Sequence, residues 1–461
     1  MNKYHRDAAP LRFSSPSTVS AVLGGLVSAL GAVLLVAAVS LYRTGAALGN
    51  LLIDFSGVVL CMGVTCLFLA GALALVTSDA DRIRYMVCRG LFDPAYGNPM
   101  GLKEGQILPS VQCRAVKIRG SYPQYILRVY VVGCEIDNVA ALASYITSTL
   151  TGRYSNYAIT QTYTALSGTH VDFLVEDVTV DKTIIARSTD DLKPDLPTTL
   201  MVQQGTNIDL TTSGSILVAG KTRSGKTTGI IALLLQVLQW GKDSFGSVVT
   251  IIDPKRAELS RLPGVVTVDD DGGGHAILEA MKRFAACITE RQAALNDLSE
   301  KLGDAAKWWD AEMHPCFLFL DEFVACRSLF PARADKNDPE YCVAEFDNIL
   351  KRIITMGASA GCFAIISIAE ASVQEGGLPA MLRSAMSTKI LFRPTMPEAR
   401  LLWPSEKLDA MMHKGHYAPG EAWFSSTDGE HDDVGFVKFP RMDFAAYREL
   451  GTLLRLYGGD D

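Results

Sequence analysis

The chain has 461 residues, enough for about two to three domains of ordinary size. Charged residues make up 20% of it and the mean hydropathy is +0.18, values that favour membrane segments beside a globular part. The formal net charge of −7 excludes a uniformly basic nucleic-acid binder but leaves room for a local basic track. The 10 cysteines are scattered without a C-x-x-C pair or a Cys/His group at metal spacing, so the sequence predicts reduced thiols and no zinc site.

Two apolar runs near the N-terminus predict a pair of membrane-spanning helices. Residues 19–41 and 55–76 contain no charged side chain, and each is long enough as a helix to cross a hydrocarbon core of about 30 Å. The loop between them carries only Arg43 as a basic residue, whereas basic residues flank the pair at Lys3, Arg6, Arg12, Arg82, Arg84 and Arg89. The positive-inside rule therefore predicts a hairpin with both chain termini in the cytoplasm and residues 1–18 as a cytoplasmic tail.

Small residues at four-residue spacing occur within the first apolar run. Gly24 and Ser28 form one such pair, and Gly25 and Ala29 form another. Small side chains allow close helix packing, which would serve either closure of the hairpin or contacts between subunits.

Residues 101–191 are typical of a small α+β domain. Gln124–Val132 favours a strand, and Asp137 is a plausible N-cap for a helix over Asn138–Leu150. Tyr157–Ala165 and His170–Val178 predict a β-hairpin. No catalytic cluster is evident there, and the polar, proline-bearing stretch 190–197 is typical of a linker.

From residue 198 to 461, strands and helices alternate as in a parallel α/β sheet. We expect strands at Ser215–Ala219, Val248–Ile252, Cys316–Leu320, Phe363–Ile368 and Lys389–Phe392. Expected helices cover Thr227–Trp240, His275–Leu302 and Tyr341–Met356.

A phosphate-loop motif, G-x-x-x-x-G-K-[ST], lies between the first of these strands and the first helix. Glycine lets backbone N–H groups close around phosphate oxygens, and the helix directs its positive end at the same anion. In this motif Lys226 reaches the β- and γ-phosphates of ATP, and the Thr227 hydroxyl binds Mg²⁺. The predicted nucleotide-binding residues are Gly220, Lys221, Thr222, Arg223, Ser224, Gly225, Lys226, Thr227 and Thr228.

Two carboxylates end the apolar run Cys316–Leu320. A buried strand would deliver Asp321 to the sheet edge beside the phosphate loop, where it can hold Mg²⁺ together with Thr227. Glu322 would then polarise the attacking water as a general base. Lys226, Asp321 and Glu322 are therefore the predicted catalytic residues, and the pair of carboxylates indicates hydrolysis rather than nucleotide binding alone.

Four stretches in this order resemble FtsK/SpoIIIE-type DNA translocases of the HerA/FtsK class. They are the phosphate loop, IIDPKRAELS at 251–260, LFLDEF at 318–323 and KLDAMMHKGHYAPG at 407–420. The resemblance extends from about Gly101 to Phe439, and the small α+β domain is similar to the β-subdomain of those motors. It implies a RecA-like ATPase that assembles as a homohexameric ring around double-stranded DNA without reading its sequence.

The architecture of one hairpin, a small domain and a motor is most similar to coupling proteins of conjugative elements of Gram-positive bacteria. This implies a multi-pass protein of the bacterial cell membrane that feeds DNA to a transfer channel, with relaxase and secretion-channel proteins as partners. One departure stands at Ala369, where the family usually has a sensor Gln. It makes slow or strongly regulated hydrolysis an expectation.

Other features leave alternatives open. A trans-acting arginine is expected in such rings, and Arg352, Arg383 and Arg393 are candidates, each of which is also compatible with a surface role. Lys255 and Arg256 suit contacts with DNA or a neighbouring subunit, and Asp269–Asp271 suit a solvated loop. The alternative functions are an FtsK-like ATPase of a protein secretion system, and a membrane adaptor that binds ATP with little hydrolysis.

Overall fold

The computed structural model describes residues 16–43, 48–76, 78–92, 99, 110–116, 123–131, 135–241, 247–369, 379–409 and 416–457. The tail 1–15, residues 370–378, which follow Ala369, and residues 410–415 of the KLDAMMHKGHYAPG stretch lie outside the described residues. The chain divides into two compact units, residues 1–180 and 181–461.

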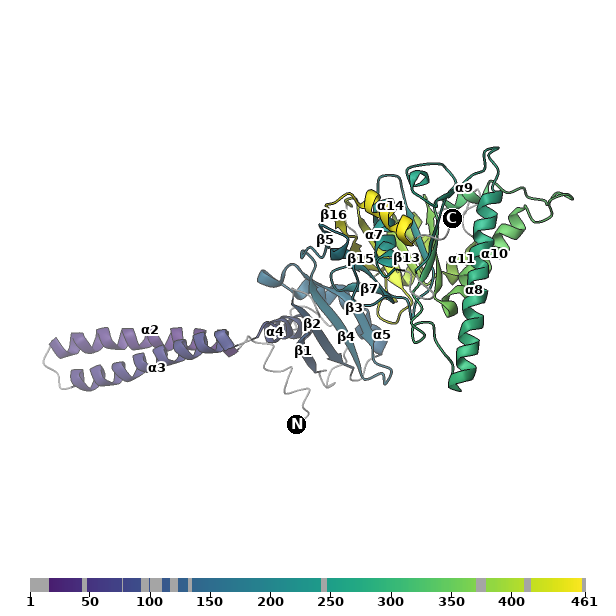
Figure 1. The fold of residues 1–461 in the computed structure, drawn as a ribbon. Helices are drawn as coiled ribbons and strands as arrows, with labels where there is room; N and C mark the ends of the chain where they lie inside the picture. Colours follow the sequence, from purple (N-terminus) through teal and green to yellow (C-terminus); the bar gives the residue numbers. More distant parts are fainter. Residues whose placement is uncertain are drawn as a thin grey trace. The chain divides into compact units, whose positions relative to one another are not determined.

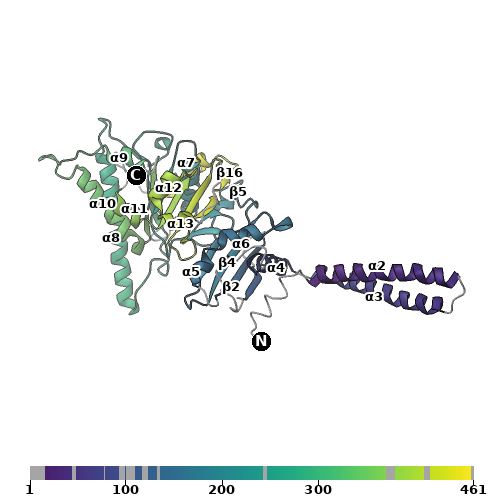
Figure 2. The ribbon, with the colours of Figure 1, turned by 180° about the vertical axis from the view of Figure 1, so that it is seen from behind.

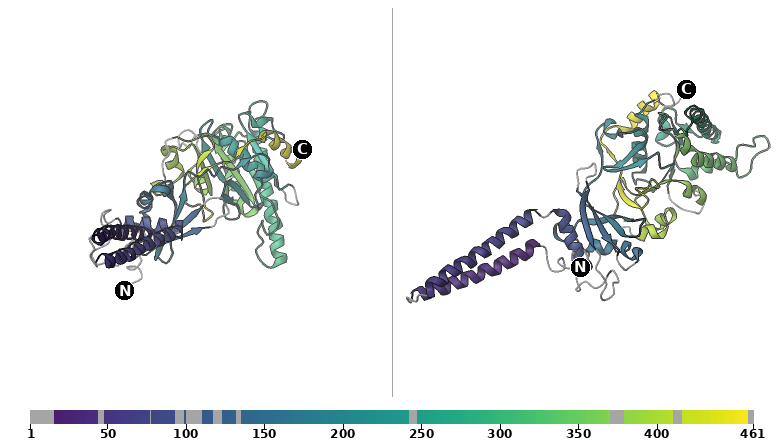
Figure 3. Two further views of the ribbon diagram at one scale, coloured as in Figure 1. Left: turned by 90° about the vertical axis from the view of Figure 1, so that its left-hand side faces the viewer. Right: turned by 90° about the horizontal axis from the view of Figure 1, so that it is seen from below.

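The first unit begins with two long helices, α2 (Pro16–Arg43) and α3 (Leu48–Val76), which lie side by side as a hairpin (Figure 3). A Cβ added at Gly24 would stand 2.9 Å from the backbone nitrogen of Leu67, so this glycine lets the two backbones approach closely. A Cβ at Gly25 would meet nothing within 4 Å. The small residue at Gly24 therefore closes the hairpin, whereas Gly25 takes no part in that contact.

The outer faces of the hairpin carry apolar side chains. Leu26 is 65% exposed, Val33 66% and Phe68 82%. Over the described residues, no helix is both long and apolar enough to cross a membrane. The membrane hairpin therefore stays a prediction from the sequence.

The rest of the first unit is a four-stranded antiparallel sheet with helices packed on it (Figure 2). Its strands in spatial order are β1 (Val111–Val116), β2 (Gln124–Tyr130), β4 (His170–Asp177) and β3 (Tyr157–Thr164). Three helices bury their apolar residues with this sheet in one cluster: α4 (Asp79–Phe92), α5 (Ile136–Ala140) and α6 (Ala143–Thr149). The predicted β-hairpin is confirmed by the pairing of β3 with β4.

The predicted helix over Asn138–Leu150 is wrong in detail, because the chain forms the two short helices α5 and α6 there. The N-cap of α5 is Glu135 rather than Asp137, and no side chain caps it. The boundary between the units lies at Val180, before the stretch 190–197 that we expected to be the linker. Leu192 in that stretch is fully buried in the core of the second unit.

The second unit is built on an eight-stranded sheet, mostly parallel, which confirms the α/β class (Figure 1). In spatial order its strands are β10 (Val266–Thr267), β9 (Val249–Asp253), β11 (Cys316–Leu320), β12 (Cys362–Ile368), β8 (Ile216–Gly220), β13 (Thr388–Phe392), β14 (Glu421–Ser426) and β15 (Gly435–Lys438). The last two strands run antiparallel to their neighbours. The five predicted strands agree with the observed ones to within a residue at each end.

Helices bury both faces of this sheet, because successive strand residues point to opposite sides. On β11, Leu318 and Leu320 join the core under α8 (His275–Leu302) and α10 (Val343–Met356). The alternate residues, Phe317 and Phe319, join the core under two other helices, α7 (Lys226–Leu238) and α14 (Ala446–Tyr457). A strand that is buried on both faces is followed by its first polar residues at its carboxyl end. The polar residues that follow neighbouring parallel strands can therefore meet along that end of the sheet.

Shorter elements complete the unit. These are β5 (Ile185–Ala186), which pairs with β16 (Arg441–Met442), the hairpin of β6 (Thr199–Gln203) and β7 (Thr206–Asp209), and the helices α9 (Phe323–Arg327), α11 (Ala380–Ala385), α12 (Met396–Leu402) and α13 (Ser405–Asp409).

Candidate nucleotide site

The phosphate loop lies where the sequence predicts it, between the end of β8 and the start of α7. Gly225 precedes the helix with φ of +93°, a conformation that L side chains rarely adopt. A Cβ at this position would stand 2.4 Å from the backbone nitrogen of Gly420, which itself donates a hydrogen bond to the Ser224 carbonyl at 2.9 Å. Glycine is therefore required at position 225 both by the turn and by the approach of a second backbone segment.

The other predicted nucleotide-binding residues differ in how far they are exposed to solvent. Ser224 is buried, whereas the side chains of Lys221, Thr222 and Arg223 are exposed. Thr227 is half-buried on the first turn of α7 and Thr228 is exposed. The helix begins at Lys226, so its unpaired N–H groups and its positive end face the loop in which an anion would bind.

Lys226 is held inside the protein by two acceptors. Its Nζ donates to the carbonyl oxygen of Ile368 at 3.1 Å and lies 3.8 Å from Oε2 of Glu322. Burial lowers the pKa of Lys226, while the charges of Glu322 and Asp321 act in the opposite direction. The Lys226 ammonium group therefore lies near Asp321 and Glu322, the two carboxylates that the sequence predicted in the same site.

Asp321 follows the last residue of β11, and its backbone N–H donates to the Ile252 carbonyl on β9 at 2.9 Å. Burial raises the pKa of the Asp321 carboxyl against the lowering effect of Lys226, and the nearby carboxylates of Asp253 and Glu322 raise it further. A buried carboxylate among like charges suits a divalent cation, whose charge would reverse this balance. The oxygen donors of Asp321 and Thr227 fit Mg²⁺, which prefers such ligands.

Glu322 is the centre of the polar contacts. Its backbone has φ of +53°, a left-handed conformation that costs a non-glycine residue about 1–3 kcal/mol and persists only where surrounding contacts impose it. Its Oε1 accepts a hydrogen bond from the Ala369 backbone N–H at 3.0 Å, and its Oε2 lies 3.3 Å from Nζ of Lys255. The backbone N–H of Ala369 thus contacts the predicted general base, at the position where the sequence resemblance led us to expect a sensor Gln side chain.

Lys255 lies in the candidate site, a position that sequence reasoning missed. We expected it to face DNA or a neighbouring subunit, but it lies against Glu322. Asp253 shapes its loop, since that fully buried carboxylate accepts hydrogen bonds from the backbone N–H groups of Lys255, Ala257 and Ser260 at 2.8–3.1 Å. The sequence predicted both strands, β9 and β11, and each is followed by charged residues. It did not reveal that the two strands are neighbours, which is what brings those residues to the same edge of the sheet.

Arg256, which we expected to face the same partners, is turned onto its own loop. Its guanidinium NH2 donates to the carbonyl oxygens of Val268 and Asp269 at 2.9 and 3.0 Å. In this structure its contacts hold two loops of the same unit together.

The three candidate trans arginines are separated by the fold. Arg352 donates to the Thr289 hydroxyl at 2.6 Å, and Arg383 to the Leu401 carbonyl at 2.8 Å. Arg393 directly follows Phe392, which is paired with Gly220. Of the three, Arg393 therefore lies at the end of the sheet that carries the phosphate loop, and action on a neighbouring subunit stays a prediction for all of them.

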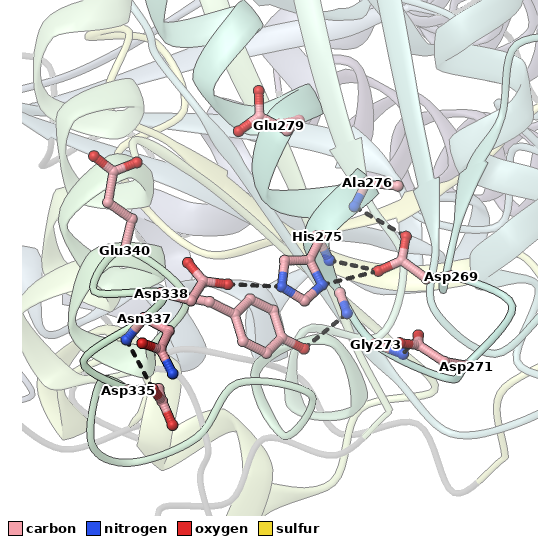
Figure 4. Close-up of polar contacts among 12 residues, drawn as sticks. Asp269, Asp271, Gly273, His275, Ala276, Glu279, Asp335, Asn337, Asp338 and Glu340 are labelled. Atoms are coloured by element: carbon pink, nitrogen blue, oxygen red, sulfur yellow. Dashed lines mark hydrogen bonds and ion pairs between the residues drawn. The ribbon is translucent and has the colours of Figure 1, made fainter.

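In the acidic segment 269–271, Asp270 and Asp271 are exposed, as expected of a solvated loop, whereas Asp269 makes contacts within the protein (Figure 4). Asp269 accepts hydrogen bonds from the backbone N–H groups of His275 and Ala276 at 2.8 and 3.1 Å, at the start of α8. The His275 ring lies between two carboxylates, with Nδ1 3.3 Å from Asp269 and Nε2 2.9 Å from Asp338, and it stacks on Tyr341. Hydrogen bonding to Asp338 raises the pKa of His275.

The site thus combines a phosphate loop, an ammonium group, a carboxylate suited to Mg²⁺ and a second carboxylate close to both, as in a nucleotide-hydrolysing α/β protein. No protein-family model and no curated protein matches the chain. Among solved structures it is similar to the conjugation coupling protein TcpA of pCW3, in its monomer form with ATPγS, at 15% identity over 76% of this chain and 93% of that one, with a TM-score of 0.46.

Two further solved structures belong to secretion ATPases. EssC (ATPases 2 and 3) of Geobacillus thermodenitrificans is 16% identical over 60% of this chain, with a TM-score of 0.43. The cytoplasmic domain of the type VII secretion ATPase EccC of Thermomonospora curvata is 15% identical over 61%, with a TM-score of 0.39. The match spans 52% and 33% of those two chains. The chain is structurally similar to FtsK-like ATPases. At these identities the likeness concerns the fold alone, so function has to be inferred from the chain's own residues.

Proposed function

We propose that this protein is a membrane-anchored, ATP-driven DNA translocase, acting as the coupling protein that feeds double-stranded DNA to a conjugative transfer channel. The observation that carries the enzymatic part is the convergence of Lys226, Asp321 and Glu322 beside the phosphate loop. These residues come from two separate sequence segments, and the fold brings them together within range of electrostatic interaction.

The chemistry follows from these positions. Phosphate oxygens of ATP bind the loop N–H groups, and Lys226 moves to the β- and γ-phosphates. Thr227 and Asp321 would hold Mg²⁺, which would neutralise charge on the phosphates when bound. Glu322 accepts the proton of a water whose oxygen attacks the γ-phosphorus, and the bond to the β,γ-bridging oxygen breaks to give ADP and phosphate.

The DNA-translocating part is supported by the motif order, above all by IIDPKRAELS followed by LFLDEF. A contact agrees with this order, since Lys255 from the first motif lies against Glu322 from the second, so these two stretches form one site. A ring of six subunits would contact DNA phosphates through a few basic or backbone donors, which an acidic chain can still provide. Arg352, Arg383 or Arg393 would act across the subunit boundary, with relaxase and channel proteins as further partners.

The membrane anchor is supported by the apolar side chains that the described part of the hairpin exposes, including Leu26, Val33 and Phe68. A water-exposed surface of this kind requires an apolar cover. Lipid is the cover that the two uncharged runs and the distribution of basic residues favour.

The deciding experiment measures phosphate release by the full chain in detergent micelles or nanodiscs, with and without double-stranded DNA. We expect DNA to stimulate turnover, Lys226→Ala to abolish it, and substitution of the exposed Lys301 by Ala, at the far end of α8, to leave it unchanged. Turnover that ignores DNA but rises with a secreted protein would support the secretion ATPase instead. ATP binding without turnover would support the adaptor, for which Ala369 is the best sequence argument.

A further inference from the structure

Three cysteines that are far apart in the sequence meet at the end of the sheet opposite the phosphate loop. Cys316 and Cys362 are the first residues of the adjacent strands β11 and β12 and are paired in register. Cys287 reaches them from α8. The three Sγ atoms lie within 4.8 Å of one another. At about 3.3 Å per residue, the length of β11 separates this cluster from Asp321 by about 16 Å.

This cluster differs from ordinary buried thiols. Among the described residues, these three form the group of His, Cys, Asp or Glu side chains whose ligand atoms are close enough to share one ion. Cys326 and Cys342 are also buried in the same unit but do not belong to it. Cys316 and Cys362 are 1% and 0% exposed, whereas Cys287 is only partly buried.

A buried cation lies against the cluster. Arg291 follows Cys287 by one turn of α8 and is 1% exposed. Its NH1 donates to Sγ of Cys316 at 2.7 Å, and its NH2 donates to the His314 carbonyl at 2.8 Å. Burying a guanidinium charge is costly unless anionic or hydrogen-bonding partners compensate for it, and the Cys316 sulfur and the His314 carbonyl are partners of this kind.

We propose that Cys287, Cys316 and Cys362 form a binding site for a thiophilic divalent cation, Zn²⁺, with Arg291 as the hydrogen-bond donor to one ligand sulfur. Zinc–sulfur bonds of about 2.3 Å place ligand sulfurs about 4 Å apart, so the observed cluster needs only a small contraction. Three thiolates, one divalent ion and one guanidinium sum to zero net charge, which removes the main penalty for burying such a centre. N–H donation to a ligand sulfur is the kind of outer contact that orients metal ligands.

Such a site would fasten α8 to β11 and β12. These three elements also carry the core under the nucleotide site, since β11 delivers Asp321 and Glu322 at its other end. The proposed zinc site does not depend on ATP hydrolysis, so an experiment can support or refute it separately from the proposed function.

The test is zinc binding by the reduced full chain, without nucleotide or Mg²⁺. Zinc is titrated in competition with a chromophoric chelator, and Cd²⁺ serves as a probe through its thiolate charge-transfer absorption. We expect one ion per chain. Cys287→Ser, Cys316→Ser and Cys362→Ser should each weaken binding at least about 10-fold, and Arg291→Leu by about 10- to 100-fold. Cys342→Ser, a buried thiol outside the cluster, and Lys226→Ala should bind zinc as the wild type does.

A second measurement on the wild-type chain covers variants that fail to fold. Bound zinc should protect Cys287, Cys316 and Cys362 from alkylation, read residue by residue by mass spectrometry, and leave the labelling of Cys113, a partly exposed thiol outside the cluster, unchanged. Absence of stoichiometric binding, or zinc that protects no cluster cysteine, would overturn the proposal. So would a Cys316–Cys362 disulfide that forms readily in air while the reduced chain takes up no metal.

Discussion

Replacing Glu322 with Gln should tighten ATP binding while stopping hydrolysis. The Nζ of Lys226 lies 3.8 Å from Oε2 of Glu322 and donates a hydrogen bond to the carbonyl oxygen of Ile368. A phosphate group must draw the ammonium away from these acceptors before the loop can hold it. The Glu322→Gln substitution would keep the size of the side chain and an acceptor for the Ala369 N–H but would remove the competing charge.

The magnitude follows from the geometry. The side chains of Lys226 and Glu322 are 11% and 13% exposed. At an effective dielectric constant of about 20, a pair at this distance attracts by about 4 kcal/mol before desolvation is counted. Desolvation cancels much of this, and a net contribution of about 1.4 kcal/mol corresponds to a tenfold change in affinity. We therefore expect ATP to bind Glu322→Gln about 10-fold more tightly, and turnover to fall by about 10²- to 10⁴-fold because the general base is lost.

The assay combines calorimetric titration of Mg²⁺–ATP with steady-state phosphate release, and Glu345→Gln on α10 is the matched control. Glu322 also raises the pKa of Lys226, which burial lowers, so the variant should lose ATP binding at a lower pH than the wild type as the solution becomes alkaline. Unchanged affinity would show that the ion pair does not compete with phosphate. Persistent turnover would remove Glu322 from the catalytic role.

Three further predictions address neighbouring features. Asp321→Asn removes a buried carboxyl whose pKa is raised, so without Mg²⁺ the variant should have a melting temperature no lower than that of the wild type at pH 7. Its Mg²⁺-dependent turnover should fall at least about 100-fold, and normal turnover would contradict the role of Asp321 in holding the metal. Gly225→Ala places a Cβ 2.4 Å from the Gly420 nitrogen at a positive φ, which should cost about 1–3 kcal/mol in chemical denaturation and at least about tenfold in ATP affinity. His275→Gln should lower the free energy of unfolding by about 0.5 kcal/mol at pH 6, because the half-exposed His275 gains little from its carboxylates. Since the folded pKa of His275 is raised, this difference should be complete below the unfolded pKa and disappear as pH rises through the folded one, and a difference that persists at pH 9 would refute the reasoning.

Local patterns in the sequence were sufficient for five strands of the larger sheet and for half of the site. The strand at Cys316–Leu320, read from its apolar run, and the helix at His275–Leu302 were both predicted at their observed bounds. The phosphate loop was readable because its glycines and its lysine are required within one short turn. Asp321 and Glu322 were readable because a buried strand must end where its first charged residues begin.

Tertiary structure alone decided which segments meet. Lys255 was assigned to a partner because nothing in its neighbourhood reveals that β9 lies beside β11, and only that adjacency turns it toward Glu322. The approach of Gly420 to Gly225 has the same origin. Strand order within a sheet depends on packing between distant elements, and no local periodicity encodes it.

The cysteines show this division most clearly. By spacing, Cys287, Cys316 and Cys362 are isolated residues, and the sequence predicted no metal site from them. The register of β11 against β12 and one face of α8 bring their sulfur atoms within 4.8 Å. The sequence determines which reactive side chains the protein has. Which of those side chains come together depends on packing between distant segments, and only the tertiary structure decides that.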